Sequence, residues 1–529
     1  NVAVGKSALV LNTTASNNTA VGGCSLYANT TGAANTAVGK DALKANTIGD
    51  DNVGIGQRAL LSNTTGSRNT AIGKNALKAN TTANNNTAIG QQSLCSNTTG
   101  SENTGVGRNT LKSTTSGKYN SAIGDGTLQD NTTGCLNTGD GYHALACNTI
   151  ACFNTAVGAC SLYANTTGCQ NAAFGFKALV ANTCGNENTA SGAYSLFSNT
   201  TGSCNTAYGG ESLYNNTTGH RNTAVGVRAL NNNTTSSYNT ALGTCALYAN
   251  TGYDNTAIGF RTLVTNTSGI RNTASGKYAL RDNTTGQKNT AIGTYALMKN
   301  TTASYNTGSG TYSLYNNTTG NDNTASGYKA LFCNTTASYN VAFGKNALKV
   351  NTTGSKNTAL GTFTLLANST GDHNTASGYR ALASNTTGCF NTASGYAALI
   401  NNTTGCHNTA FGRAALLDNT TGPINTAVGS DALCANTTGE RSAAFGYQAL
   451  LKATTGGFNT GVGAYSLNQS TTAKCNVAVG TEAMFYNTVG CENTSIGFRS
   501  LHCNTTANGN TASGVCSLYA NTSGSCNTA

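Results

Sequence analysis

The apolar and polar positions of this chain recur every 17 residues. The repeat reads Asn-Thr-Ala-(Val/Ile/Phe/Ser)-Gly-x-x-(Ala/Ser)-Leu-x-x-Asn-Thr-Thr-Gly-x-x, opens first at Asn1, and ends in a stub at Asn527 to Ala529. One copy, residues 239–254, has 16 residues. So short a repeat, kept for so long, indicates a solenoid in which each copy packs only on its neighbours.

A copy of this length is too short for two packed helices, and Asn, Thr and Gly are poor helix formers. It fits two short strands and two turns. In the copy that opens at Asn35, the predicted strands are residues 35–39 and 42–46. The sequence therefore predicts an all-β fold: a parallel β-solenoid, specifically a flattened two-sheet β-roll of about 31 turns that forms one continuous domain over residues 1–529. We expect a longer parent polypeptide, because the chain ends inside a repeat.

Two positions of the repeat are nearly invariant. The fifth is Gly in every full copy, beginning with Gly5, Gly22 and Gly39. This indicates a positive φ or a very close backbone approach. The ninth is Leu in every full copy except at Met484, beginning with Leu9, Leu26, Leu43, Leu60 and Leu77. We predict that this leucine ladder forms a narrow core, with small residues at the third and eighth positions.

The fourth position is mostly Val, Ile, Leu or Phe, but it is Asp140 in one copy, Tyr208 in another and Ser in seven. An unpaired Asp is rarely buried. The position therefore lies either at a roomy end of the interior or on an outward face that contacts another chain. We favour the second interpretation, which makes the fourth position an oligomer seam.

Asn recurs at the first and twelfth positions, where stacked side-chain amides at about 4.8 Å can bond to one another. The twelfth position also starts an Asn-Thr-Thr glycosylation motif, as at Asn12, Asn29 and Asn63. Glycans on adjacent rungs would collide, so we favour the ladder. Glycosylation of a few exposed asparagine or threonine residues is the alternative.

The chain has 19 cysteines, and several share a phase on consecutive turns. The in-phase columns are Cys135, Cys152 and Cys169, and Cys389 and Cys406. Neighbours stacked about 5 Å apart lie within disulfide range. Disulfides in an oxidising compartment and unpaired surface thiols are both compatible with this pattern. The spacing is not that of a metal site.

Composition excludes several function classes. The 29 basic and 18 acidic residues give a net charge of +11, and the basic residues scatter among variable positions, which disfavours nucleic-acid binding. The sequence contains no run of 18 apolar residues, so it predicts no membrane-spanning helix. The five histidines are far apart, and no phosphate loop is present. We therefore predict no catalytic, cofactor-binding or metal-binding residues, and no enzyme activity.

The core of the repeat, as at Asn35 to Leu43, resembles the repeats in the heads of trimeric autotransporter adhesins. It is also similar to the Asn-Thr-Ala-Ile-Gly repeats of phage and virus tail-fibre-like surface proteins. The resemblance implies a left-handed β-roll, often trimeric, on a cell or virion surface. The repeat here is longer than in the autotransporter heads, and cysteine is more frequent.

From these observations we expect a rigid fibre or filament shaft that is extracellular or exposed on a cell or virion surface. Its partner would be the chain itself, as a homo-oligomer such as a trimer or as a head-to-tail filament. The alternative is an adhesin that binds surface glycans through variable outward positions. Its candidate contacts are Tyr27, Tyr163, Tyr214, Tyr315 and Tyr519. Ice binding is less favoured, because adjacent residues such as Thr13 and Thr14 would point to opposite sides of a strand.

Overall fold

The computed structural model describes all residues from Asn1 to Ala529. It contains 31 strands of three residues each and no helix. The chain forms two compact units, Asn1–Ser268 and Gly269–Ala529. In both, the chain coils with one strand per 17-residue repeat, so the parallel β-solenoid is confirmed. The continuity of all 529 residues as one domain and the handedness of the coil stay predictions.

Every strand covers the second to fourth positions of its repeat. The strands of the first unit are β1 (Val2–Val4), β2 (Thr19–Val21), β3 (Thr36–Val38), β4 (Val53–Ile55), β5 (Thr70–Ile72), β6 (Thr87–Ile89), β7 (Thr104–Val106), β8 (Ser121–Ile123), β9 (Thr138–Asp140), β10 (Thr155–Val157), β11 (Ala172–Phe174), β12 (Thr189–Ser191), β13 (Thr206–Tyr208), β14 (Thr223–Val225), β15 (Thr240–Leu242) and β16 (Thr256–Ile258). The strands of the second unit are β17 (Thr273–Ser275), β18 (Thr290–Ile292), β19 (Thr307–Ser309), β20 (Thr324–Ser326), β21 (Val341–Phe343), β22 (Thr358–Leu360), β23 (Thr375–Ser377), β24 (Thr392–Ser394), β25 (Thr409–Phe411), β26 (Thr426–Val428), β27 (Ala443–Phe445), β28 (Thr460–Val462), β29 (Val477–Val479), β30 (Thr494–Ile496) and β31 (Thr511–Ser513).

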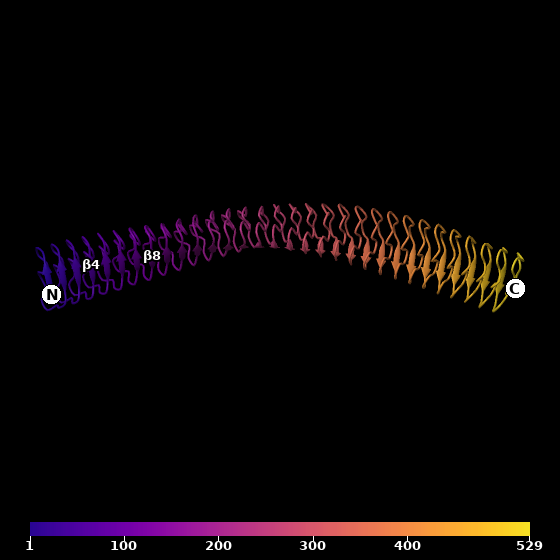
Figure 1. Cartoon of the computed structure of the whole chain (residues 1–529), viewed down its shortest axis with the longest axis horizontal. Coiled ribbons are helices and arrows are strands. Elements are labelled where there is room, and N and C mark those ends of the chain that lie inside the picture. Colours follow the sequence, from indigo (N-terminus) through magenta and orange to yellow (C-terminus); the bar gives the residue numbers. More distant parts are fainter. The chain divides into compact units, whose positions relative to one another are not determined.

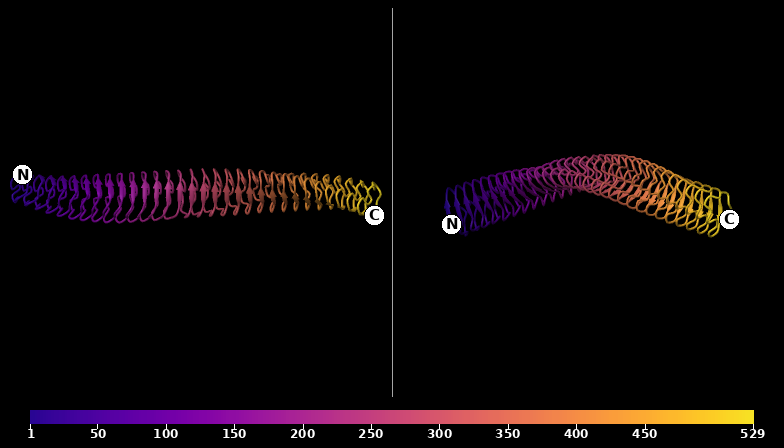
Figure 2. Two further views of the ribbon diagram at one scale, coloured as in Figure 1. Left: turned by 90° about the horizontal axis from the view of Figure 1, so that it is seen from below. Right: turned by 45° about the vertical axis from the view of Figure 1, so that its right-hand side comes forward.

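Within each unit, consecutive strands pair in parallel and in register. Strands β4 and β5, for example, align Val53 with Thr70, Gly54 with Ala71 and Ile55 with Ile72. The strands follow one another as a row of arrows, among them β4 and β8 in the first unit (Figure 1), and the connecting loops lie opposite that row (Figure 2). Equivalent residues therefore form columns that run along each unit.

The prediction of a second strand in each repeat is wrong. Residues 39–46 instead form two successive turns, closed by bonds from Ala42 N–H to the Gly39 carbonyl (3.3 Å) and from Asn46 N–H to the Leu43 carbonyl (3.2 Å). This loop still joins the next coil, since Leu43 N–H donates to the Ala59 carbonyl at 2.9 Å. Each unit thus has one sheet and, facing it, a hydrogen-bonded stack of turns rather than a second sheet.

The turn occurs because the ninth-position leucine has a left-handed backbone. Leu43 has a φ of 50° and Leu60 a φ of 52°, and the seventh position is also left-handed. A branched L-residue with this backbone is strained. Its burial offsets the strain, because the turn aims the side chain into the interior, where Leu43 and Leu60 are fully buried.

The narrow core is confirmed. The leucines lie against small residues, since the ninth-position ladder and the third-position alanines, such as Ala37 and Ala71, are fully buried. Leu9 is only half-buried because it lies in the terminal turn. A Cβ added at Gly54 would lie 3.3 Å from Leu43 Cδ1 of the preceding turn, which shows how thin the interior is.

The fifth-position glycines combine both features that their invariance predicted. Gly22 has a φ of 134°, and a Cβ there would lie 2.6 Å from the Gly39 carbonyl oxygen of the next turn. Such a contact is too close for any side chain, and the backbone conformation independently favours glycine. The fifth position therefore needs glycine for two reasons.

The fourth position points out of the sheet. Ile55, Phe174 and Ile292 are 38%, 43% and 49% exposed. The outward orientation explains why the column accepts Asp140, whose charge stays in water. A stripe beside the second-position threonines therefore follows the strands of each unit; it is mostly apolar in the first unit and is interrupted by six serines, among them Ser275 and Ser309, in the second. None of the chain's elements is a long apolar helix that could cross a membrane.

Candidate functional site

The most regular polar feature of the interior is a pair of asparagine columns. In the twelfth-position column, Asn46 donates from Nδ2 to Asn29 Oδ1 at 2.7 Å. In the first-position column, Asn52 donates from its backbone N–H to Asn35 Oδ1 at 2.9 Å. These contacts confirm the predicted ladders. Because the amides are buried, their hydrogen bonds contribute more than bonds at the surface would.

The asparagines also close each turn, a role that the sequence analysis missed. Asn52 and Asn63, at opposite ends of one repeat, both donate from Nδ2 to the carbonyl of Gly66, each at 2.8 Å. One backbone oxygen thereby ties the start of the strand to the corner. The sequence did contain a signal for this role. Wherever both positions hold asparagine, the first and twelfth residues of a repeat are separated by the same number of residues.

The glycosylation motifs coincide with the buried column. Asn29 and Asn63 are 0% exposed, whereas Asn12 is partly exposed in the first turn. In the neighbouring thirteenth column, Thr30 Oγ1 donates to the Thr47 carbonyl at 3.0 Å. The asparagine amide and the middle threonine hydroxyl of this motif are therefore both engaged inside the stack.

The sixteenth position forms a column of hydrogen-bond acceptors, and the predicted cysteine columns belong to it. Asp50 Oδ1 accepts the backbone N–H of Ala33 at 2.7 Å, and Cys152 Sγ accepts that of Cys135 at 3.0 Å. Cys169 lies in the same relation to Cys152, at 3.2 Å. All 19 cysteines are free thiols in this structure.

Cys389 and Cys406 make the closest sulfur contact of the two columns. Their Sγ atoms are 3.0 Å apart, and Cys406 Sγ also accepts the backbone N–H of Cys389. The hydrogen bond with Cys406, together with burial, raises the pKa of the Cys389 thiol to about 11. At neutral pH this thiol is protonated. Whether the columns form disulfides stays a prediction.

The histidines are not all isolated, contrary to expectation. His373 and His407 lie two turns apart with Phe390 stacked between them, at ring-centroid distances of 4.7 and 5.0 Å. His502 is nearly buried near the C-terminal end of the second unit, 3.4 Å from Glu482 Oε2. Burial lowers the pKa of His502. No group of three or more His, Cys, Asp or Glu side chains could hold a metal ion.

The short repeat leaves a depression in the first unit. Asn250 Nδ2 bonds to the carbonyl of Gly252, two residues on, where other copies span three. The missing residue is thus the second threonine of the corner. A pocket of about 530 Å³ opens there, lined by Thr235, Ser236, Ser237, Tyr238, Tyr253 and Asp254.

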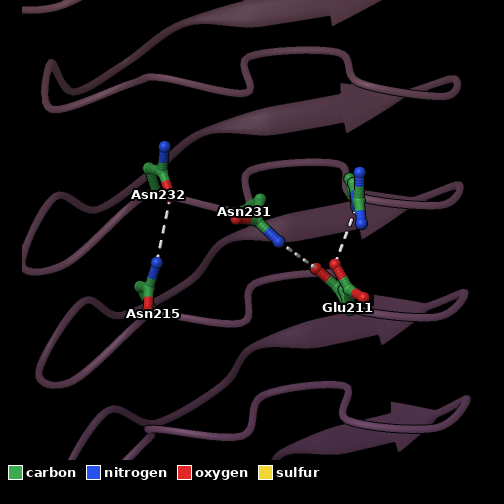
Figure 3. Close-up of polar contacts among 5 residues, drawn as sticks. Glu211, Asn215, Asn231 and Asn232 are labelled. Atoms are coloured by element: carbon green, nitrogen blue, oxygen red, sulfur yellow. Dashed lines mark hydrogen bonds and ion pairs between the residues drawn. The ribbon is translucent and has the colours of Figure 1, made fainter.

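Variable outward residues cross-link neighbouring turns. Figure 3 shows Asn215 donating to Asn232, at 3.0 Å, and Asn231 donating to the backbone carbonyl of Glu211, also at 3.0 Å. Arg228 adds an ion pair to Glu211 at 2.7 Å. The Arg228–Glu211 ion pair is exposed and worth little, whereas Asn231 is buried. These contacts join columns whose residue types change from turn to turn.

The tyrosines proposed as adhesin contacts fall into two groups. Tyr27, Tyr163 and Tyr519 are 36–39% exposed. Tyr214 stacks on Phe197 at 4.9 Å and Tyr315 on Phe332 at 5.2 Å, each pair nearly parallel. The sequence analysis did not anticipate these ring stacks, although rings in one column on consecutive turns are their signal. Compared with known proteins, the chain matches no family model and no curated protein.

Proposed function

We propose that the chain is a structural segment of an extracellular, cell-surface or virion-surface fibre, with a mechanical role rather than a catalytic one. The observation that carries this proposal is the polar ladder inside each unit, whose twelfth-position asparagine column breaks only at Thr114, Ala453 and Ser470. Successive turns are joined by backbone bonds, two asparagine columns and a threonine column, as at Asn46, Asn52 and Thr47. At about 4.8 Å per turn, each unit extends roughly 75 Å along its own axis.

Many parallel bonds at each junction favour stiffness. A bend at one junction must lengthen several hydrogen bonds and expose the leucine between them. A lost hydrogen bond costs about 1 kcal/mol, and a buried unsatisfied group costs more.

The apolar fourth-position stripe supports lateral self-association. Its residues recur at the spacing of the turns, so a partner that covers many of them needs the same repeat, and a second copy has it. Charged residues are rare in the stripe. The resemblance to tail-fibre-like proteins and autotransporter heads fits a trimer built on this face.

Self-association can be tested on the intact chain by sedimentation. We expect an oligomer at micromolar concentrations and its dissociation in the double variant Ile72→Asp and Ile89→Asp. The fold tolerates a carboxylate there, as Asp140 shows. Adding the same charges at the exposed sixth position, Gln57→Asp and Gln91→Asp, should leave the oligomer intact. A wild-type chain that sediments as a monomer would contradict the seam, and flexible coils in electron micrographs would contradict the shaft.

A further inference from the structure

The positive charge of the chain is concentrated in the second unit. Between residues 271 and 356 the sequence holds nine of the 29 basic residues and two of the 18 acidic ones, a net charge of +7 out of +11. The basic residues are Arg271, Lys277, Arg281, Lys288, Lys299, Lys329, Lys345, Lys349 and Lys356. The sequence analysis averaged charge over the whole chain and therefore missed this segment.

The same turns present a row of aromatic rings on the face opposite the strands. Tyr278, Tyr295 and Tyr312 occupy the seventh position of three consecutive copies, with ring centroids 5.5 and 5.0 Å apart and planes within 20° of parallel. Tyr315 and Phe332 form a second stack in the tenth-position column, 5.2 Å apart. The two stacks touch, because Tyr312 meets Tyr315 edge to face at 5.5 Å.

Three lysines lie on these rings. Lys277 Nζ is 5.3 Å from the centre of Tyr278 and Lys299 Nζ is 5.3 Å from that of Tyr315. Lys329 Nζ is 5.2 Å from Tyr328 and 5.6 Å from Phe332. We call the rings together with these lysines the aromatic-lysine ridge.

The lysines of the ridge have no acidic partner. Arg281 beside them is paired to Asp282 at 2.6 Å, whereas Lys277, Lys299 and Lys329 form no ion pair with a carboxylate. Each ammonium group instead lies near an aromatic ring, within reach of cation–π attraction. The three lysines of the ridge therefore carry positive charge that no ion pair offsets.

We propose that the aromatic-lysine ridge binds a linear acidic polysaccharide along the axis of the second unit. The lysines would pair with its carboxylate or sulfate groups, and the tyrosine hydroxyls would hydrogen-bond to its sugar hydroxyls. An extended polymer suits the ridge because both repeat along one direction. This binding role is independent of the fibre role, since it needs only the side chains of these turns.

The ring geometry disfavours single-stranded nucleic acid as the occupant. Proteins that bind single strands offer open ring faces on which bases stack. Here the faces of Tyr295 and Tyr312 cover each other, at 5.0 Å and 9°. The space between these two rings is therefore closed to a stacking base.

The first unit supplies a matched control surface. Between Tyr27 and Tyr119 it has no aromatic residue, yet residues 40–118 hold nine basic and four acidic residues. Lys44, Lys78 and Lys112 occupy the tenth position there. Charge alone would make the two units bind alike, and the ridge predicts that they differ.

The test is fluorescence anisotropy of labelled hyaluronan and heparin oligosaccharides titrated with the full chain, with neutral dextran and single-stranded DNA of equal charge as comparison probes. We expect at least one acidic oligosaccharide to bind, and to bind more tightly than the DNA. The triple variant Lys277→Gln, Lys299→Gln and Lys329→Gln should weaken it about tenfold or more, from three lost charge contacts. The control triple variant Lys44→Gln, Lys78→Gln and Lys112→Gln should change affinity less than about twofold.

A second variant separates rings from charge. Changing Tyr295, Tyr312 and Tyr315 to Phe keeps the stacks and lysines but removes three hydroxyls, and should weaken binding about threefold or more by loss of hydrogen bonds. Equal losses in the two lysine variants, or an unchanged affinity in the Phe variant, would overturn the ridge as the site. DNA that binds as tightly as the oligosaccharides would overturn the polysaccharide assignment, as would the absence of binding to either oligosaccharide.

Discussion

Asn402 donates from Nδ2 to Asn385 Oδ1 at 2.8 Å, and its own Oδ1 accepts Asn419 Nδ2 at 2.7 Å. The same Nδ2 reaches the carbonyl of Gly405 at 2.9 Å. One amide side chain thus joins three turns and one corner while fully buried. The side chain of Asn401, next to it, is exposed and bonds only to Asp418 at the surface. Asn402 therefore belongs to a buried ladder of side-chain amides, whereas the adjacent Asn401 makes its side-chain contact at the solvent-exposed surface.

The Asn402→Ala variant should lower the free energy of unfolding of its unit by about 2 kcal/mol, because it leaves buried partners unsatisfied. The Asn401→Ala variant should change it by less than about 0.5 kcal/mol, as for other exposed contacts. Urea denaturation followed by circular dichroism measures both. Equal effects would mean that the buried column does not stabilise the stack.

Two adjacent glycines offer a sharper contrast. Gly209 has a φ of 122°, and a Cβ there would lie 2.7 Å from the backbone carbon of Gly226. At Gly210 the φ is not left-handed, and the nearest atom would be 3.8 Å away. We expect Gly209→Ala to cost about 3 kcal/mol or more. Gly210→Ala should be neutral or stabilising by up to about 1 kcal/mol, because alanine restricts the unfolded chain.

Thermal unfolding of both glycine variants provides the measurement. Destabilisation by Gly210→Ala as large as that by Gly209→Ala would refute the role assigned to the fifth position.

The leucine ladder combines burial with a left-handed backbone, so the shape of a replacement matters. Leu348 is fully buried with a φ of 49°. Leu348→Met should cost less than about 1.5 kcal/mol, as the natural Met484 suggests, while Leu348→Ala should cost about 3 kcal/mol through the cavity it leaves. Leu348→Ile should cost more than the Met change, since β-branching adds strain at positive φ. A higher denaturation midpoint for the Leu348→Ile variant than for the Leu348→Met variant would contradict this account.

The sequence was sufficient for the period, the parallel register and the core, because the glycine and leucine columns record those constraints in every copy. It was insufficient for the loop facing the strands. A leucine every 17 residues is compatible with a strand or a turn, and the left-handed φ of Leu43 has no signature in its residue type. Polar residues such as Lys44 and Asn46 beside it were the available hint, since they are depleted in strands.

The outward surface was harder to predict because its columns vary. Asp140 correctly indicated that the fourth position faces out. The ring stacks and the charge of residues 271–356 were hidden, because they depend on which variable residues coincide on consecutive turns. Aligning the copies by position makes Tyr278, Tyr295 and Tyr312 a visible column.

Burial also predicts the modification state of the Asn-Thr-Thr motifs. In a secreted chain made by a glycosylating host, we expect Asn29 and Asn63 to be unmodified, because a glycan cannot fit at a side chain with no exposed surface. Asn12 is partly exposed and is the better candidate. Glycopeptide mass spectrometry of the folded protein is the measurement. Full occupancy at Asn29 together with a native circular dichroism spectrum would refute the buried ladder.

Oxidation should discriminate between two cysteines of similar acidity. The pKa of Cys389 is raised to about 11 by its hydrogen bond to Cys406 and by burial, and that of Cys434 to about 11 by burial and Asp418. A raised pKa keeps a thiol protonated, so both should react slowly with iodoacetamide at pH 8 and faster as pH rises towards 11. Folding stability should fall over the same range. The stability that each protonated thiol contributes is fully present below about pH 8.5, the pKa of a cysteine in the unfolded chain. It is lost as the pH rises through the folded-state pKa of about 11.

Geometry, in contrast, separates the two thiols. Cys389 Sγ is 3.0 Å from Cys406 Sγ, and bond formation needs the sulfurs to approach by about 1 Å. Mild oxidation with oxidised glutathione at pH 9 should therefore join Cys389 to Cys406, while Cys434 remains alkylatable. Peptide mapping without reduction identifies the linked pair, and Cys406→Ser should restore alkylation of Cys389. Equal oxidation of Cys389 and Cys434 would show that exposure, and not register between turns, controls thiol chemistry in this fold.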